Sequence, residues 1–242
     1  MKIPKLSGLI KRRFLLNYRI DPQVLKEFLP APFKPKLYDG YGIGGICLIR
    51  LENIKPDCSL LPFGISSENA AHRFAVTWGD DQEGVYIPRR DSNSRLNNLA
   101  GGRLFPGVHH FARFDIKEDQ DSFEVKMQAK DGKVDIGFKG TVATTFPSDS
   151  CFSSLAEASD FFERGSLGYS DTNQQGDFHG ITLQVKKWEV SPFEVTEISS
   201  NFFDDQGIFP ADCISFDHGL IMRDIEHEWQ SEDDICSCEA IP

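Results

Sequence analysis

The clearest pattern along the chain is a strict alternation of apolar and polar residues on both sides of Asp131-Gly132. Apolar residues occupy every second position over 123–129, and the alternation continues over 134–138. Successive side chains of a strand point to opposite faces of a sheet, and Asp-Gly is a type I′ turn signal. The two segments are therefore predicted to form an antiparallel hairpin with one buried and one wet face.

A second hairpin is indicated upstream. Phe74, Val76 and Trp78 alternate with Arg73, Ala75 and Thr77, and Val85-Tyr-Ile follows a turn that runs from Gly79 to Gly84. Further strands are predicted over 14–20, 181–190 and 194–198, and the segment 214–229 stays open between strand and helix.

Two short helices interrupt the strands. Asp21-Pro22 provides an N-cap and a proline at the first helical position, and Pro30 ends the helix. Ser154 and Glu157 form a capping box, and Gly165 ends a second helix over 155–164.

The glycines between Gly40 and Gly45 match the dinucleotide-binding pattern G-x-G-x-x-G. That pattern requires a preceding strand and a following helix. Here an apolar run typical of a strand follows, so the glycines are interpreted as points where a long strand bends, as barrels require.

Turns join the predicted strands, with no crossover helices between them, which favours a largely antiparallel sheet. Closing this sheet into a barrel would remove its exposed edges. The 242 residues contain no repeat or linker, so we predict a mainly β (α+β) fold with one domain over 1–230 and an acidic tail over 231–242.

Charge and cysteine usage narrow the function. The net charge of −11 argues against nucleic acid and anionic membranes as partners, and the basic run Lys11-Arg12-Arg13 is interpreted as a solvated strand end. No apolar signal segment is visible, so a cytoplasmic location with six reduced cysteines is expected.

The candidate chemistry gathers in 99–114, which contains Gly101, Gly102, Arg103 and the only adjacent histidines, His109 and His110. Histidine titrates near neutrality, so such a pair suits acid/base work. The alternative is a glycine-containing loop that enters a strand. No His-x-His or His-Glu-x-x-His spacing is present, and no metal site or cofactor is predicted.

A family resemblance adds to these observations. The segment 14–33, with Tyr-Arg-Ile-Asp before a helix and a Leu-Pro-Ala-Pro stop, resembles the opening of acetoacetate decarboxylase. Ser67-Glu68 resembles the segment with that family's active-site glutamate, and Gly102-Arg103-Leu-Phe resembles its Gly-Arg-Glu-Leu segment. Glu68-Asn69 with Arg73 and Gly84-Val-Tyr86 is closer to an uncharacterised branch of the superfamily. The resemblance implies an antiparallel closed β-barrel with an internal pocket, two or three short helices and homo-oligomers.

One departure from the family excludes its chemistry. The decarboxylase uses a lysine that forms a Schiff base and a second lysine that lowers its pKa. Counting from Gly102-Arg103 places His110 and Phe111 at these positions. Imidazole cannot form the iminium, so no Schiff base is expected. Lys186-Lys187 is interpreted as surface.

We therefore expect a small-molecule enzyme or, alternatively, a non-catalytic barrel that binds a small carboxylate-bearing ligand. A structural or assembly role is a third reading. Glu68 is the candidate general base and His110 the acid/base group. Arg73 and Arg103 are candidate carboxylate anchors, and His109 and Tyr86 are further candidate substrate contacts. Structural alternatives are a turn cap for Glu68, a pair with Asp91 for Arg73 and a strand end for the histidines.

Overall fold

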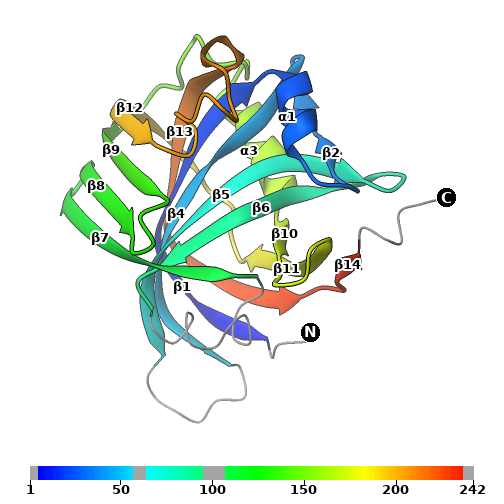
Figure 1. Ribbon diagram of the computed structural model, residues 1–242. Helices are drawn as coiled ribbons and strands as arrows, with labels where there is room; N and C mark the ends of the chain where they lie inside the picture. Colours follow the sequence, from blue (N-terminus) through cyan, green and yellow to red (C-terminus); the bar gives the residue numbers. More distant parts are fainter. Residues whose placement is uncertain (1–4, 57–63, 95–106, 237–242) are drawn as a thin grey trace.

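The computed structural model describes residues 5–56, 64–94 and 107–236 (Figure 1). Arg103, Gly101 and Gly102 lie outside the described residues. The elements in chain order are β1 (Leu6–Ile20), α1 (Pro22–Phe28), β2 (Lys34–Pro35), β3 (Leu37–Tyr38), β4 (Tyr41–Pro56), β5 (Ile65–Trp78), β6 (Gln82–Ser92), β7 (His109–Asp119), β8 (Ser122–Ala129), β9 (Asp135–Val142), α3 (Leu155–Arg164), β10 (Leu167–Asp171), β11 (Asp177–Val185), β12 (Ser191–Ser200), a 3-10 turn (Ala211–Cys213), β13 (Ile214–Ser231) and β14 (Ile235–Cys236).

The two predicted hairpins and both helices are confirmed. β8 pairs antiparallel with β9, with Met127 opposite Ile136, and β5 pairs antiparallel with β6. The Asp21 side chain accepts hydrogen bonds from the first turn of α1, and Ser154 Oγ accepts one from the Glu157 N–H of α3. Local capping residues and the alternation of apolar residues are thus sufficient to predict where these hairpins and helices lie.

The sheet closes on itself twice within the described part of the chain. Strands β13, β1, β4, β5 and β6 lie side by side, and β7, β8, β9 and β12 lead from β6 back to β13. On the other side, β10 and β11 also connect β6 to β13. The fold is therefore a closed barrel that is mostly antiparallel, as predicted, with parallel pairs where β6 meets β7 and β10.

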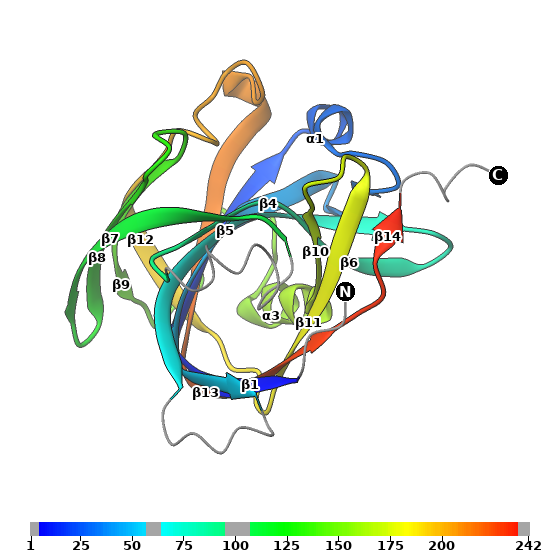
Figure 2. The same cartoon turned by 60° about the horizontal axis from the view of Figure 1, so that its bottom comes forward.

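The two faces of these shared strands have different surroundings. One face packs against an aromatic core in which Phe14 lies 5.0 Å from the ring centres of Phe123 and Phe138. The other face is covered by α3, which is seen in the middle of the ring in Figure 2. Phe162 of α3 packs there with Leu15 and Ala75. Because the shared strands are buried on both faces, side-chain alternation decides which neighbourhood each residue enters.

Several boundaries differ from the sequence-based predictions. The strand predicted over 181–190 ends at Val185, because the chain then leaves the sheet and Trp188 Nε1 donates a hydrogen bond to Ser159 Oγ of α3. The ambiguous segment 214–229 is the strand β13, which pairs with β1 over its whole length. Within the predicted acidic tail, Ile235 and Cys236 form β14 against β11.

The expectation of six free thiols is wrong for Cys236, which is disulfide-bonded. Cys47, Cys151 and Cys213 are free cysteines. Cys58 and Cys238 lie outside the described residues. The sequence was a poor guide to Cys236, because a disulfide depends on which thiols the fold brings together.

In the ranges that the structure covers, no helix is long and apolar enough to cross a membrane.

Candidate functional site

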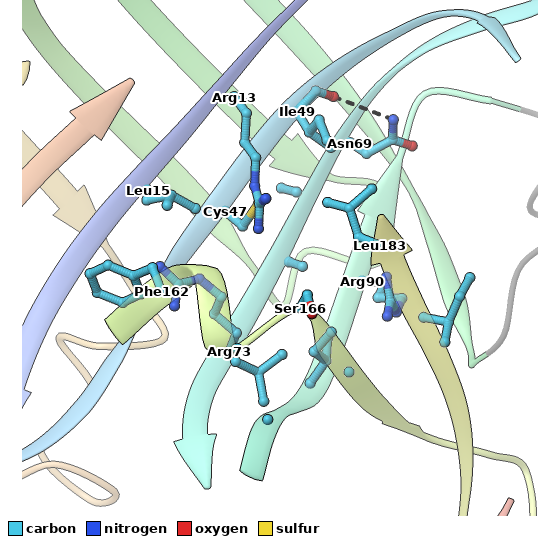
Figure 3. Close-up of a pocket in the computed structure, with 18 of the residues that line it drawn as sticks. Arg13, Leu15, Cys47, Ile49, Asn69, Arg73, Arg90, Phe162, Ser166 and Leu183 are labelled. Carbon is cyan, nitrogen blue, oxygen red and sulfur yellow. Dashed lines mark hydrogen bonds between the residues drawn. The ribbon is translucent and has the colours of Figure 1, made fainter. Parts of the chain in front are cut away.

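A cavity lies between the shared strands, α3 and the strands β10 and β11 (Figure 3). The space open to the centres of water molecules is about 100 Å³, which is enough for several waters or a small organic acid. Its lining is mostly apolar, with polar groups at a few positions. The polar or basic side chains that line it are Arg13, Lys36, Cys47, Asn69, Arg73, Arg90, Asp91, His109 and Ser166.

Strand register explains how residues far apart in sequence reach this cavity. Leu15 of β1 lies opposite Cys47 of β4, and Cys47 lies opposite Ala71 of β5. Ala71 lies opposite Arg90 of β6, which lies beside His109 of β7. Residues in one row across a sheet share a face. This row therefore brings a thiol, a guanidinium and an imidazole to one wall.

Arg73 is the most deeply buried of the cavity's cations, with 4% of its surface exposed. Its Nη2 donates to Asn17 Oδ1 over 2.6 Å, and its guanidinium lies 4.8 Å above the ring of Phe162. Gly45 separates Asn17 from Arg73 in the register. A Cβ at Gly45 would lie 3.1 Å from Asn17 Oδ1, so the missing side chain leaves the path for this hydrogen bond open.

A chain of hydrogen bonds continues from Asn17 away from the cavity. Since Arg73 can only donate, Asn17 presents its oxygen to Arg73 and its Nδ2 to Nε2 of His218 at 2.9 Å. Nε2 then accepts, so Nδ1 carries the proton and donates to Asp217 Oδ2 over 2.6 Å. Asp217, His218 and Asn17 thus hold Arg73 in place through neighbouring strands.

The pKa values of this chain agree with a neutral His218 and a charged Asp217. Burial lowers the pKa of His218 below its usual value. Burial alone would raise the pKa of Asp217, but hydrogen bonds from His218 and Ser150 bring it to about 2. The positive charge of Arg73 therefore meets only the neutral amide of Asn17.

Arg90 forms the second cationic centre of the cavity. Its Nε donates to Ser170 Oγ of β10 over 2.8 Å, and its buried Nη2 has no hydrogen-bond partner among the described residues. Burial lowers the pKa of Arg90 and that of Arg73 to about 10, so both stay charged at neutral pH. Burial and the nearby Arg90 lower the pKa of His109 to about 3, which leaves its imidazole neutral.

Arg13 adds a third guanidinium beside Cys47. Its Nε donates to Cys47 Sγ over 3.3 Å. Within the described ranges no carboxylate forms a salt bridge with Arg13, Arg73 or Arg90. The cavity is therefore positive inside a chain whose net charge is −11.

The other charged residues of the lining are already paired. Arg89 binds Asp91 through contacts of 2.8 to 3.2 Å, so the predicted alternative of an Arg73–Asp91 pair is wrong. Lys36 Nζ lies 2.7 Å from Glu83 Oε2 and 4.4 Å above the Phe161 ring. Among the charged side chains of the described lining, this leaves the arginines to bind an anion in the cavity.

The structure places Arg73 and His109 in the cavity and Glu68, His110 and Tyr86 outside its lining. Glu68 forms buried ion pairs with Arg12 and Arg50 at 3.1 Å. Glu68 was expected to face this cavity together with at least one of His109 and His110, with His110 preferred. Strand β5 alternates and presents Glu68 on the face opposite Arg73, so Glu68 does not line the cavity, and of the two histidines it is His109 that does.

His110 and Tyr86 have partners of their own away from the cavity. His110 Nδ1 lies 3.3 Å from Asp131 at the turn of the β8–β9 hairpin. Tyr86 donates to Asp171 over 2.9 Å and stacks on Phe33. Arg103 lies outside the described residues, so its predicted role stays a prediction.

Sequence analysis missed Arg13, Asn17, Cys47, Arg90 and His218. The basic run at 11–13 was interpreted as solvated, but Arg12 is 5% exposed and paired with Glu68. Alternation along the strand could have indicated these residues. Arg13 and Asn17 each lie two positions from Leu15, so all three share one face of a strand that is buried on both faces. No cluster of three or more metal-ligating side chains occurs among the residues with described positions.

The fold is that of a closed, mainly β-barrel protein with a cavity beside helix α3. One family model matches most of the chain. The DUF2071 family, described as an uncharacterized conserved protein, matches residues 10–218. The chain belongs to this family. No curated protein matches it.

Solved structures share the fold at low sequence identity. Acetoacetate decarboxylase from Legionella pneumophila is 12% identical with a TM-score of 0.62, and the match covers 96% of this chain and 89% of that one. An acetoacetate decarboxylase-like enzyme from Sphingomonas wittichii RW1 is 12% identical with a TM-score of 0.56, covering 96% and 92%. The enduracididine biosynthesis enzyme MppR, complexed with pyruvate, is 11% identical with a TM-score of 0.56, covering 97% and 91%. The chain therefore has the acetoacetate decarboxylase-like fold.

Proposed function

We propose that this protein binds a small organic acid or keto acid in the barrel cavity without forming a Schiff base. The observation that carries the proposal is the pair of guanidiniums of Arg73 and Arg90, which face an apolar cavity with neutral hydrogen-bond partners only. A buried charge without a counter-ion is costly. A carboxylate that enters the cavity would compensate that cost through charge-assisted hydrogen bonds.

A second candidate is catalysis on the bound acid by non-covalent acid/base chemistry, and His109 favours it. Its imidazole lines the cavity next to Arg90 and is neutral at pH 7. Burial is the main cause of the low His109 pKa, and the charge of Arg90 adds to it. An anion on Arg90 would offset this second contribution and so raise the pKa of the imidazole. The roles first assigned to Glu68 and His110 thus pass to His109 in this proposal.

Calorimetric titration with pyruvate and acetoacetate tests the binding. We expect the wild type to bind and Arg73→Gln to lose affinity at least tenfold, because one charge-assisted contact is removed. Arg113→Gln is the matched control, since Arg113 is exposed on β7. Equal affinities for all three proteins, or no binding to any, would contradict the proposal.

The wider expectations from the sequence stay predictions. They are a cytoplasmic location, a homo-oligomer, and no nucleic-acid or membrane partner.

A further inference from the structure

Arg73 and Arg90, two of the three arginines that line the cavity, are held apart by their own hydrogen bonds. The Arg73 guanidinium extends from β5 across β4 to Asn17 on β1. The Arg90 guanidinium extends in the opposite sense, from β6 to Ser170 on β10. In sheet order these strands run β1, β4, β5, β6, β10. The two side chains therefore diverge from neighbouring strands.

This divergence sets the distance that a ligand must bridge. Neighbouring strands are about 4.8 Å apart, so heads that lean away from β5 and β6 lie on the order of 10 Å from each other. A guanidinium holds a carboxylate oxygen at about 2.8 Å. One carboxylate cannot contact both heads, whereas two carboxylates at the ends of a short chain can.

The space between the two heads is suited to a short apolar chain. Cys47 of β4 and Ala71 of β5 lie in one row with Arg90, and Arg73 lies two positions further along β5. Arg13 also reaches this row, where its Nε donates to Cys47 Sγ over 3.3 Å, so the third guanidinium of the cavity lies beside this space. Ile87 and Leu183 complete an apolar lining around this part of the cavity. No described carboxylate is available here, since Asp91 is bound by Arg89.

We propose that the physiological ligand is a dicarboxylic acid with a short chain, with one carboxylate on Arg73 and the other on Arg90. This rests on the proposed function, because it specifies the ligand of the same cavity. Each guanidinium then receives a counter-ion that the described residues do not supply. A monocarboxylate satisfies only one of the two.

The test compares diacids with their own monomethyl esters, which are nearly identical in size and carry one charge fewer. Succinate, glutarate and adipate, each with its monomethyl ester, are titrated into the wild type by calorimetry. We expect at least one diacid to bind tenfold or more tightly than its ester.

Variants then assign the two ends of the ligand. In Arg73→Gln and in Arg90→Gln, the diacid should lose at least tenfold in affinity, and its advantage over the ester should shrink to about twofold or less. Arg113→Gln should behave as the wild type. Arg73→Lys and Arg90→Lys keep the charge and guard against a folding defect, and thermal unfolding of each variant checks that it is folded.

Two negative outcomes have different meanings. If diacids and esters bind wild type equally well and more weakly in the Arg73 variant, the dicarboxylate proposal is overturned and the proposed function stands. If no acid binds the folded wild type at any concentration up to about 10 mM, the proposed function itself fails. This range covers dissociation constants in the millimolar region.

Discussion

At the scale of single residues, the molecule keeps two arginines charged in an apolar enclosure. Arg73 is 4% exposed, and burial lowers its pKa only to about 10. Asn17 orients the guanidinium without neutralising it. A carboxylate in place of that amide would have produced a closed ion pair, so the choice of an amide leaves Arg73 available to an anion.

The adjacent histidines offer an internally controlled experiment. His109 lines the cavity beside Arg90, whereas His110 contacts Asp131 outside it. We expect His109→Ala to change the affinity for pyruvate or a diacid by about three- to tenfold, as for the loss of one hydrogen bond of about 1 kcal/mol. His110→Ala should leave the affinity within twofold. Calorimetric titration of both variants measures the two affinities. A larger effect of His110→Ala would contradict the assignment of His109 to the cavity.

The absence of Schiff-base chemistry is a second prediction at this scale. Lys36 is a lysine of the cavity lining, and it is held by Glu83 and the Phe161 ring. Formation of a Schiff base would require the Lys36 nitrogen to give up its ion pair with Glu83 and its contact with the Phe161 ring. Borohydride treatment with pyruvate or acetoacetate should give no added mass by mass spectrometry. A covalent adduct that maps to Lys36 and is absent from Lys36→Met would show that a Schiff base does form there.

At the scale of elements, alternation along β5 separates two neighbourhoods. Asn69, Ala71, Arg73 and Ala75 line the cavity, while His72 and Phe74 pack with Phe202 on the other face. Glu68 and Arg73 are five positions apart, an odd number, so a regular strand cannot present both to one site. This parity alone excludes the predicted Glu68–Arg73 site once the segment is known to be one strand.

Gly45 connects strand geometry to the site. A Cβ there would lie 2.5 Å from the Leu16 carbonyl oxygen and 3.1 Å from Asn17 Oδ1. Gly45→Ala should therefore lower the free energy of unfolding by about 1–3 kcal/mol, as overpacking does, and weaken anion binding by displacing Asn17 from Arg73. Urea unfolding and calorimetry measure the two effects.

Gly137→Ala is the matched control for this change. Gly137 also lies in a strand, and its added Cβ would meet only the hydroxyl of Ser199, a side chain that can rotate. Its effect on stability should be smaller than that of Gly45→Ala, and anion binding should not change. Equal effects of the two substitutions would argue against a specific role for Gly45.

At the scale of the whole molecule, burial of neutral histidines makes the fold sensitive to acid. His72 and His227 are 0% and 1% exposed. Burial, with the nearby charge of Arg89 on His72 and of Arg13 on His227, lowers their pKa values to about 3 and about 4. In the unfolded chain a histidine titrates near 6.5.

The sign of the pH effect follows from these values. Below about pH 6.5 the unfolded state binds protons that the folded state does not, so stability is complete above that pH and falls as pH falls. At pH 5 each of the two histidines should lower the free energy of unfolding by about 2 kcal/mol relative to its value at neutral pH. Urea unfolding at pH 7.5 and pH 5 measures the loss. His227→Gln should reduce the difference by about that amount, while His179→Gln, a change at a partly exposed histidine, should reduce it by less.

The sequence by itself determined the parts of this protein that depend on neighbours along the chain. Alternation and Asp131-Gly132 specified the β8–β9 hairpin, and Asp21 and Ser154 specified where both helices begin. Motifs in the right order indicated the acetoacetate decarboxylase-like fold, and the position of His110 led to the prediction that no Schiff base forms. These features need only backbone geometry, local hydrogen bonds and residue identity.

The tertiary structure alone decided which polar residues meet. His218, Asn17 and Arg73 are distant in sequence and become neighbours only through the pairing of β13, β1, β4 and β5. Arg90 and His109 join them because β6 pairs in parallel with β7. A shift of one residue in any of these registers reverses the face that a side chain occupies. That is why counting along the chain selected Glu68 and His110 as the acid/base pair and missed Arg90, although it had selected Arg73 and His109 as substrate contacts.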